Sequence, residues 1–299
     1  MGKLLVCDPI ATSAIEAMRE AGIEVDVRDD ITPEELEEVI GDYAAMVVRS
    51  RTKVREPLID KADQMQVIIR GGVGLDSIDV AYAQAQGIDV RNTPEASSNA
   101  VVELVLGLMF SLARHIARAD RSLKAGNWEK KQLKGIELAG KTLGIVGYGR
   151  IGQLLGKKAK LLGMQVVAYD PYVEHPDLVP LDTLLGSADF LSIHVPLSEE
   201  TRHLIDAEAL AKMKDGVYVV QASRGGTIDE DALYEALVSG KVTAAALDVY
   251  TEEPPTRPGL RKLVELPQTV VTPHIGASTV EAQDRVGEEI VRIAKAYLA

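Results

Sequence analysis

The sequence predicts an α/β protein built from two doubly wound parallel sheets. Short apolar runs of strand length alternate with helical stretches along nearly all of the 299 residues. The alternation occurs in two series, and the segment "NTPEASS" at 92–98 separates them. Repeated strand–helix–strand order produces parallel sheets covered by helices. A composition with 46% hydrophobic and 26% charged residues is ordinary for a globular protein with a sizeable core.

The first series contains five apolar runs that predict buried strands. Between the first two runs, residues 13–22 place Ile15, Met18 and Ala21 at helical spacing. A long helical pattern then runs from about Ala100 to about Lys124. The five expected strands are 3–8, 22–27, 44–50, 66–70 and 87–92.

The second series predicts a second sheet, with helical stretches between most of its strands. The last helical pattern, 279–298, comes after the final strand. The expected strands are 141–149, 165–170, 189–195, 216–223, 243–249 and 268–274. The expected helices include 151–163, 206–214 and 230–240.

Charge and cysteine content exclude several classes of partner and site. The formal net charge of −12 disfavours nucleic acid and anionic membrane surfaces, which repel an acidic protein. Cys7, the single cysteine, lies in an apolar run, so no disulfide can form within the chain. The longest apolar segment contains Glu103 and is too short to span a bilayer, and the N-terminus lacks a signal-peptide pattern. We therefore expect a soluble cytoplasmic protein.

A glycine-rich turn opens the second series. Gly147, Gly149 and Gly152 form a G-x-G-x-x-G pattern that follows an apolar strand and opens a helix. The first glycine permits a tight turn, the second a close approach to a pyrophosphate, and the third close helix–strand contact. The helix N-terminus offers free N–H groups to phosphates, and Arg150 is expected to add a contact. The turn predicts a bound dinucleotide.

An acidic residue at the end of the next strand selects between dinucleotides. Asp170 lies 23 residues after Gly147, where a carboxylate can accept hydrogen bonds from the adenosine ribose. It would repel the extra phosphate of NADP, and "PYVE" after it supplies no arginine. The predicted cofactor is NAD.

Three polar residues follow strands of the second series. Arg224, Glu253 and His274 each lie just past a predicted strand, so the same edge of one sheet can present them together. An arginine can grip a carboxylate, a histidine can move a proton near neutrality, and an acid can tune that histidine. Spacing alone does not choose Glu253 over Glu252, and His194 is a rival base at another strand end. No histidines have metal-ligand spacing, so no metal is predicted.

At this point the residues resemble a known family, the D-isomer-specific 2-hydroxyacid dehydrogenases. The resemblance covers essentially the whole chain. It rests on "LGIVGYGRIGQ", "SRGGTIDEDAL", "ALDVYTEEPP" and "TPHIGASTVEAQ", which occur in the family's order.

The resemblance implies two Rossmann-like domains with the active site in a cleft between them. The final helix would return to the first domain, giving a substrate-binding domain of 1–97 plus 277–299 and an NAD-binding domain of 98–276. It implies that Arg224, Glu253 and His274 are the catalytic residues. The cofactor-binding residues expected from the turn and the resemblance are Val73, Gly147, Gly149, Arg150, Ile151, Gly152, Asp170, Ala222, Ser223, Arg224, Asp248, His274, Gly276 and Ala277.

The resemblance also implies where the substrate binds. The backbone through Gly72 and Val73 resembles the family's carboxylate-binding loop. Trp128 and Lys130 match positions that reach a neighbouring subunit's active site, which implies at least a homodimer. The expected substrate-binding residues, which in related enzymes meet a phosphorylated substrate, are Arg49, Ser50, Arg70, Gly72 and Lys130.

The chain departs from the family pattern beside the cofactor. Gln221 and Ser223 stand where the family usually has Asn and Ala, and "IIRGG" replaces the usual Gly-Arg-Ala-Gly. Two alternatives to an enzyme acting on a phosphorylated acid remain. One is a glyoxylate, hydroxypyruvate or D-lactate type of dehydrogenase, and the other is an NAD-sensing interaction protein of the co-repressor type.

Overall fold

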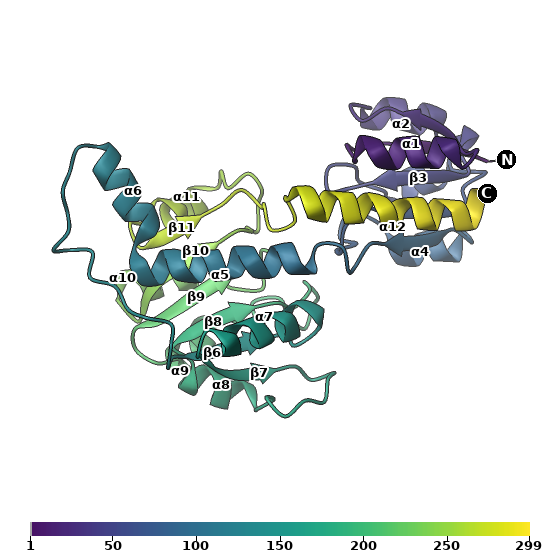
Figure 1. The fold of residues 1–299 in the computed structure, drawn as a ribbon. Coiled ribbons are helices and arrows are strands. Elements are labelled where there is room, and N and C mark those ends of the chain that lie inside the picture. The colour runs from purple at the N-terminus through teal and green to yellow at the C-terminus, as the bar shows by residue number, and fades with distance from the viewer. Residues whose placement is uncertain (1) are drawn as a thin grey trace. The chain divides into compact units, whose positions relative to one another are not determined.

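The computed structural model describes residues 2–299 and divides the chain into two compact units (Figure 1). The N-terminal unit comprises the residues up to Ser98 together with Ala277–Ala299, and the central unit comprises Asn99–Gly276. The boundaries expected from the sequence, after residues 97 and 276, lie within one residue of these. Each unit contains one sheet whose strands are all parallel, so the predicted α/β fold class is confirmed.

The N-terminal unit has a five-stranded sheet in the order β2-β1-β3-β4-β5. The chain therefore reverses its direction of winding between β1 and β3, which makes their carboxyl ends a candidate ligand-binding edge. The strands are β1 (Lys3–Val6), β2 (Glu24–Val27), β3 (Ala45–Val48), β4 (Val67–Arg70) and β5 (Asp89–Asn92). The helices are α1 (Thr12–Glu20), α2 (Pro33–Val39), the 3₁₀ helix η1 (Ile40–Asp42), α3 (Glu56–Ile59), α4 (Val80–Ala85) and α12 (Val280–Leu298).

Alternate residues of the central strands pack against opposite layers of helices in this unit. Leu4 and Val6 join the core formed with α1 and α12, whereas Leu5 and Cys7 join the core formed with α2, α3 and α4. This period of two is the reason the strands are apolar on both faces. The last helix, α12, lies along α1 (Figure 1), where a Cβ on Gly287 would come within 3.0 Å of Ala14.

The central unit has a six-stranded sheet in the order β11-β10-β9-β8-β6-β7. Its direction of winding reverses between β6 and β8, and the glycine-rich turn follows β6. The strands are β6 (Thr142–Val146), β7 (Gln165–Tyr169), β8 (Phe190–Ile193), β9 (Val217–Gln221), β10 (Val242–Leu247) and β11 (Thr269–Val271). The helices are α5 (Ser98–Arg114), α6 (Ile116–Lys124), α7 (Arg150–Leu161), α8 (Leu181–Ser187), α9 (Ala207–Lys212), α10 (Glu230–Val238) and α11 (Pro258–Glu265).

Two buried clusters fill the faces of this sheet. Leu143, Ile145 and Phe190 pack with α5 and α7, while Val146 and Ile193 pack with α8 to α11 on the other face. A sheet covered on both faces holds its strand ends rigidly, which suits it to position polar groups at one edge.

The long helix expected at about 100–124 is interrupted. Its two parts, α5 and α6, meet at an angle of 65°, and His115 between them has a φ of +55°. The carbonyl of Ala113 accepts its hydrogen bond from the backbone of Ile136, and a Cβ on Gly135 would lie 2.3 Å from that carbonyl. The returning chain therefore takes the place of the next helical turn, a contact that helical periodicity does not reveal.

Within residues 2–299, no helix is long and apolar enough by itself to cross a bilayer, although the bent pair of α5 and α6 passes that test of length and composition together.

Candidate active site

The turn after β6 has the geometry of a phosphate-binding site. Gly147 has a φ of +91°, and a Cβ on it would lie 2.7 Å from the carbonyl carbon of His194. A Cβ on Gly152 would lie 2.2 Å from the carbonyl oxygen of Gly147, because α7 packs directly on the turn. Gly149, the N-cap of α7, has open space where its Cβ would point. The free N–H groups of the helix therefore face a space that a pyrophosphate can enter.

Asp170 lies beside this turn, at the end of β7. Its two carboxylate oxygens accept hydrogen bonds from the backbone N–H of Tyr148 at 2.8 Å and of Tyr172 at 2.9 Å. These donors orient the carboxylate, which keeps further lone pairs for ribose hydroxyls. Arg150 and Ile151 open α7 next to it. The turn, the helix and the acid fit the adenosine diphosphate half of NAD.

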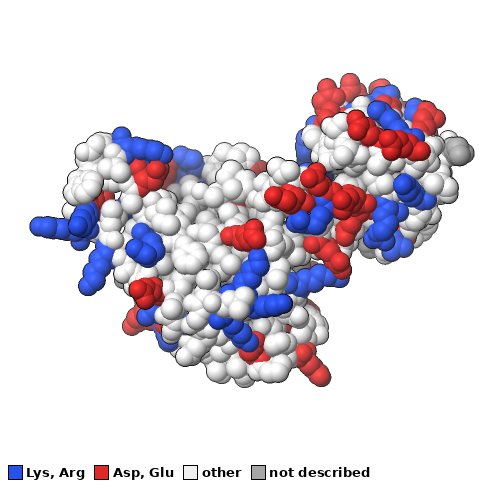
Figure 2. Space-filling view, viewed as in Figure 1, with Lys and Arg blue, Asp and Glu red and all other residues white. Residues whose placement is uncertain are grey.

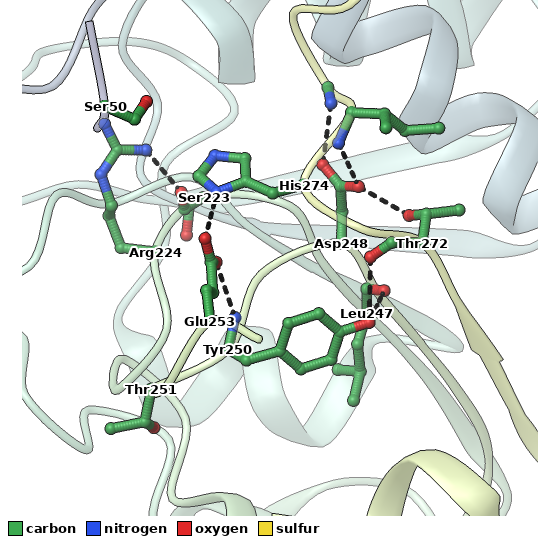
Figure 3. Close-up of polar contacts among 12 residues, drawn as sticks. Ser50, Ser223, Arg224, Leu247, Asp248, Tyr250, Thr251, Glu253, Thr272 and His274 are labelled. Carbon is green, nitrogen blue, oxygen red and sulfur yellow. Dashed lines mark hydrogen bonds and ion pairs between the residues drawn. The ribbon is translucent and has the colours of Figure 1, made fainter. Parts of the chain in front are cut away.

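The three predicted catalytic residues follow β9, β10 and β11, which are adjacent in the sheet. The Nδ1 atom of His274 lies 2.7 Å from Oε2 of Glu253, and Oε1 of Glu253 accepts a hydrogen bond from the backbone of Tyr250 at 3.2 Å (Figure 3). Glu252 is bonded instead to Thr256. The structure thus brings Glu253, and not its neighbour, to the histidine.

The electrostatics of this pair suit proton transfer. Burial raises the pKa of Glu253, but hydrogen bonds from His274 and Tyr250 and the charges of His274 and Arg224 outweigh it, so the pKa lies below its ordinary value. The Glu253 side chain is therefore an anion at neutral pH. The side chains of His274 and Glu253 are 41% and 38% exposed, so a substrate can reach them.

A buried carboxylate holds the loop that carries His274. Asp248, only 1% exposed, accepts hydrogen bonds from Oγ1 of Thr272 at 2.6 Å and from the backbone of Ile275 and Gly276 at 2.8 and 2.9 Å. These contacts bracket His274, whose φ is +53°. Asp248 therefore maintains an unusual backbone conformation at the proposed base. Its predicted role as a direct cofactor contact stays a prediction, as do those of Gly276 and Ala277.

The loop after β9 is built to lie against the loop of Glu253. A Cβ on Gly225 would lie 2.0 Å from the carbonyl of Tyr250, so only glycine allows this approach. The hydroxyl of Tyr250 donates to the carbonyls of Leu247 and Thr272, tying β10 to β11. The first glycine after Arg224 thus allows this backbone contact.

Gln221 organises the start of the same loop. Its amide nitrogen donates to the carbonyl of Arg224 at 2.9 Å and to Thr227, and its amide oxygen accepts from Oγ of Ser223 at 2.9 Å. The guanidinium of Arg224 donates to the carbonyl of Ser223 at 2.7 Å. Gln221 and Ser223, the two departures from the family pattern, therefore bond to each other and hold the loop. Ala222 lies between them.

His194, the rival base, is in a different environment. Its Nε2 lies 2.8 Å from Oγ of Ser192, while its buried Nδ1 has no hydrogen-bond partner among residues 2–299. Burial lowers the pKa of His194 to about 4. The ring is therefore neutral at neutral pH and has no carboxylate to support a positive charge.

In the N-terminal unit, the predicted substrate-binding residues follow the adjacent strands β3 and β4. Arg49 donates to Oε1 of Gln283 on α12, and burial lowers the pKa of Arg49 although the charge of Asp8 raises it. Arg70 lies 3.4 Å from Oγ of Ser50 and donates to the carbonyl of Gly71 at 3.1 Å. These contacts place two guanidinium groups near one edge of the sheet.

Glycine at position 72 and a buried aspartate shape this edge. Gly72 has a φ of +144°, and a Cβ there would lie 1.3 Å from Nη1 of Arg70. Val73, the next residue, is 37% exposed. Asp8, 1% exposed, accepts hydrogen bonds from the backbone of Arg49 at 2.5 Å. Asp8 lies in no motif, and Gln283 ends the quoted motif "TPHIGASTVEAQ" without having been singled out, so the sequence did not identify either residue as part of the site.

Lys130 is separate from these groups along the chain. It lies in the loop after α6, close to Trp128, which is 80% exposed. In the described part of the chain, Lys130 makes no hydrogen bond or ion pair. No group of three His, Cys, Asp or Glu side chains within residues 2–299 is arranged to hold a metal ion.

Known proteins of the same architecture identify the family. A model of the D-isomer specific 2-hydroxyacid dehydrogenase NAD-binding domain matches residues 106–276. A hydroxypyruvate reductase of Thermotoga maritima is 53% identical over 96% of this chain and 95% of its own length. The chain belongs to the D-isomer specific 2-hydroxyacid dehydrogenase family. Members of this dehydrogenase family are NAD-dependent oxidoreductases, so the prediction of such an enzyme is confirmed.

Other dehydrogenases extend the comparison. The D-3-phosphoglycerate dehydrogenase of Methanocaldococcus jannaschii is 48% identical over 100% of this chain, which spans only 59% of that protein. The crystal structure of a glyoxylate reductase from Paecilomyes thermophila matches with a TM-score of 0.90 at 32% identity, covering 100% of this chain and 97% of the other. A D-lactate dehydrogenase from Aquifex aeolicus, complexed with NAD and lactic acid, matches with a TM-score of 0.86 at 29% identity, covering 98% and 94%.

Proposed function

We propose that this dehydrogenase oxidises D-3-phosphoglycerate to 3-phosphohydroxypyruvate, the first step of phosphorylated serine biosynthesis. The observation that carries the proposal is the pair of guanidinium groups after β3 and β4. Arg49 is partly buried, burial lowers its pKa, and its guanidinium donates to the neutral amide of Gln283. A buried guanidinium is stabilised most by a ligand that carries negative charge. The phosphate of phosphoglycerate carries that charge, whereas the hydroxyl of an unphosphorylated acid does not.

In this mechanism the central unit carries the chemistry. Arg224 holds the substrate's carboxylate through its guanidinium group. Nδ1 of His274 is bonded to Glu253, so Nε2 is the atom that takes the proton from the 2-hydroxyl. Bound NAD supplies the acceptor for the hydride that leaves C2. As the C–O bond becomes a carbonyl, Glu253 stabilises the imidazolium that forms.

The residues of the turn hold the dinucleotide. The N–H groups at the start of α7 and the space beside Gly149 receive the pyrophosphate. Asp170 accepts hydrogen bonds from the ribose hydroxyls, and its negative charge repels a 2′-phosphate, which supports NAD over NADP.

A second candidate is reduction of an unphosphorylated oxo acid, such as hydroxypyruvate. It is supported by the Thermotoga maritima relative, which is named a hydroxypyruvate reductase and is 53% identical, against 48% for the phosphoglycerate dehydrogenase of Methanocaldococcus jannaschii. On this proposal Arg49 would contribute little to the binding of substrate.

The two candidates are separated by NADH formation from D-3-phosphoglycerate, D-glycerate and D-lactate, with the oxo acid removed by a coupled reaction. We expect the highest kcat/KM for phosphoglycerate. Loss of a hydrogen bond to a charged group costs about 1.5–3 kcal/mol, so Arg49→Ala should raise the KM for phosphoglycerate roughly 10- to 100-fold. The KM for glycerate should hardly change.

The matched control is Arg28→Ala, which removes a guanidinium bonded to Asp26 at 3.1 Å on the same unit. Equal effects of Arg49→Ala on both substrates, or a higher kcat/KM for glycerate than for phosphoglycerate in the unmodified enzyme, would favour the second candidate.

We also propose that the enzyme is a homodimer. Three apolar side chains of α6 and the following loop are strongly exposed: Ile116 at 52%, Leu123 at 60% and Trp128 at 80%. Such a cluster is a common mark of a subunit interface. Sedimentation should give twice the chain mass of 32.2 kDa, and Trp128→Ala should shift the equilibrium towards the monomer. The predicted cytoplasmic location stays a prediction.

A further inference from the structure

Tyr148, the residue between the first two glycines of the turn, contacts two carboxylates. Its backbone N–H donates to Oδ2 of Asp170 at 2.8 Å, and its hydroxyl donates to Oδ2 of Asp177 at 2.8 Å. The two aspartates bracket the segment that follows β7. One residue of the phosphate-binding turn therefore holds both ends of the segment 170–177.

Asp177 is held from several directions. Lys160 of α7 donates to both of its carboxylate oxygens, at 2.8 and 2.6 Å. Its backbone carbonyl accepts from Ala168 of β7 at 2.8 Å. The ring of His175 packs edge-on against the ring of Tyr148, with centroids 4.9 Å apart. The carboxylate, 15% exposed, therefore joins α7, β7 and the turn in one network.

The surrounding chain makes room for the hydroxyl. A Cβ on Gly156 of α7 would lie 2.7 Å from the hydroxyl oxygen of Tyr148. Tyr148 is 2% exposed, and burial raises its pKa, as does the bond to Asp177, so the hydroxyl stays protonated and donates. A phenylalanine would fill the same apolar space. What the hydroxyl adds to this packing is the hydrogen bond to Asp177, which a phenylalanine could not make.

We infer that Tyr148 is a positioning residue for the adenosine half of NAD. By its hydrogen bond to Asp177, the hydroxyl of Tyr148 helps to fix the position of the segment 170–177 relative to the phosphate-binding turn. The inference rests on the proposed contact of Asp170 with the ribose, and not on which hydroxy acid is oxidised. Tyr148 touches no reacting atom, so it acts on the binding of the cofactor and not on the chemical step.

The test is direct binding of fragments of the cofactor to Tyr148→Phe. A hydrogen bond to a charged group commonly contributes enough for about a 10-fold change in affinity. We expect the Kd of NAD and of ADP-ribose to rise by about that factor together, while the Kd of nicotinamide mononucleotide is unchanged. At saturating NAD, kcat and the KM for the hydroxy acid should stay within about twofold of the unmodified enzyme.

Two further variants sharpen the result. Asp177→Ala removes the bonds from both Tyr148 and Lys160 and should weaken ADP-ribose binding at least as much. Adding Tyr148→Phe to it should change the affinity little further, because the partner of the hydroxyl is already gone. Tyr82→Phe is the matched control, since its hydroxyl donates to Asp60 at 2.6 Å in the other unit. It should change no affinity.

Other outcomes overturn the inference. An unchanged affinity of Tyr148→Phe for ADP-ribose would show that the hydroxyl does not position the adenosine site. Equal weakening of nicotinamide mononucleotide would show a general structural effect. The proposal that phosphoglycerate is the substrate can fail independently of this inference, because none of these binding measurements uses a hydroxy acid. Asp170→Ala tests the underlying assignment, and an unchanged ADP-ribose affinity in that variant would also overturn the inference.

Discussion

Removing the charge of Glu253 is the sharpest perturbation of the proposed proton transfer. Glu253→Gln keeps the length of the side chain and can still bond to Tyr250. It replaces the carboxylate, whose oxygen lies 2.7 Å from Nδ1 of His274, with a neutral amide. The imidazolium formed during oxidation would then have no negative partner at that nitrogen.

The size of the effect follows from distance and exposure. Two unit charges about 4 Å apart interact by about 1 kcal/mol in water and about 4 kcal/mol at an effective dielectric constant of 20. Because the side chains of His274 and Glu253 are 41% and 38% exposed, solvent screening places the value near the lower limit. A loss of about 1 kcal/mol of transition-state stabilisation corresponds to about a fivefold lower rate.

The sign follows from the shared interaction. The hydrogen bond and charge of His274 lower the pKa of Glu253, so the carboxylate stays ionised at neutral pH and stabilises positive charge on the ring during proton transfer. Without that carboxylate, the kcat/KM for oxidation on its pH plateau should fall by up to about fivefold, since the transferred proton is less well stabilised.

The assay is kcat/KM for NADH formation against pH, with Glu252→Gln as control because that glutamate is bonded to Thr256. A plateau of kcat/KM that is unchanged in Glu253→Gln, or that falls equally in the control, would refute the proposed coupling between the acid and the base.

Three further predictions concern the same loops. His274→Ala should lower kcat about 10²- to 10⁴-fold, measured at saturating NAD, while the Kd of NAD stays within a few-fold. Gly225→Ala should lower kcat/KM and thermal stability together, since its Cβ would lie 2.0 Å from the carbonyl of Tyr250; unaltered kinetics would contradict that contact. Asp248→Asn should destabilise the fold by about 1–3 kcal/mol in denaturant unfolding, because an amide cannot accept all of the hydrogen bonds that the buried carboxylate receives.

Sequence reasoning located the groups that carry a chemical signature. The glycine-rich turn and the strand ends that bear Arg224 and His274 are set by local patterns, because parallel strands in one sheet end at one edge. The choice between Glu252 and Glu253 depends on which carboxylate the loop turns inward, and two adjacent residues look alike in a sequence. The break at His115 depends on a segment that returns from about twenty residues downstream.

Three residues have structural roles that sequence reasoning did not identify: Gly225, Tyr250, and Asp248, which was expected only as a cofactor contact. They bond or pack mainly against backbone, and backbone groups are the same whatever the sequence. Their contacts hold the backbone of His274 in a left-handed conformation, which residues other than glycine rarely adopt. The catalytic side chains can thus be recognised in the sequence by their type. The accuracy with which they are positioned depends on contacts that appear only once the fold is known.

The division of the chain separates two kinds of selectivity. The proposed acid and base and the dinucleotide-binding turn belong to the central unit, where they are fixed by its own strands and loops. The cations that would select a phosphorylated substrate, Arg49 and Arg70, belong to the N-terminal unit and are held by Gln283 and Ser50 within it. Substitutions of Arg49 or Arg70 can therefore change which hydroxy acid is oxidised without moving the groups that transfer the proton. The relatives, named for hydroxypyruvate, phosphoglycerate, glyoxylate and lactate, are consistent with chemistry retained in one unit and substrate choice varied in the other.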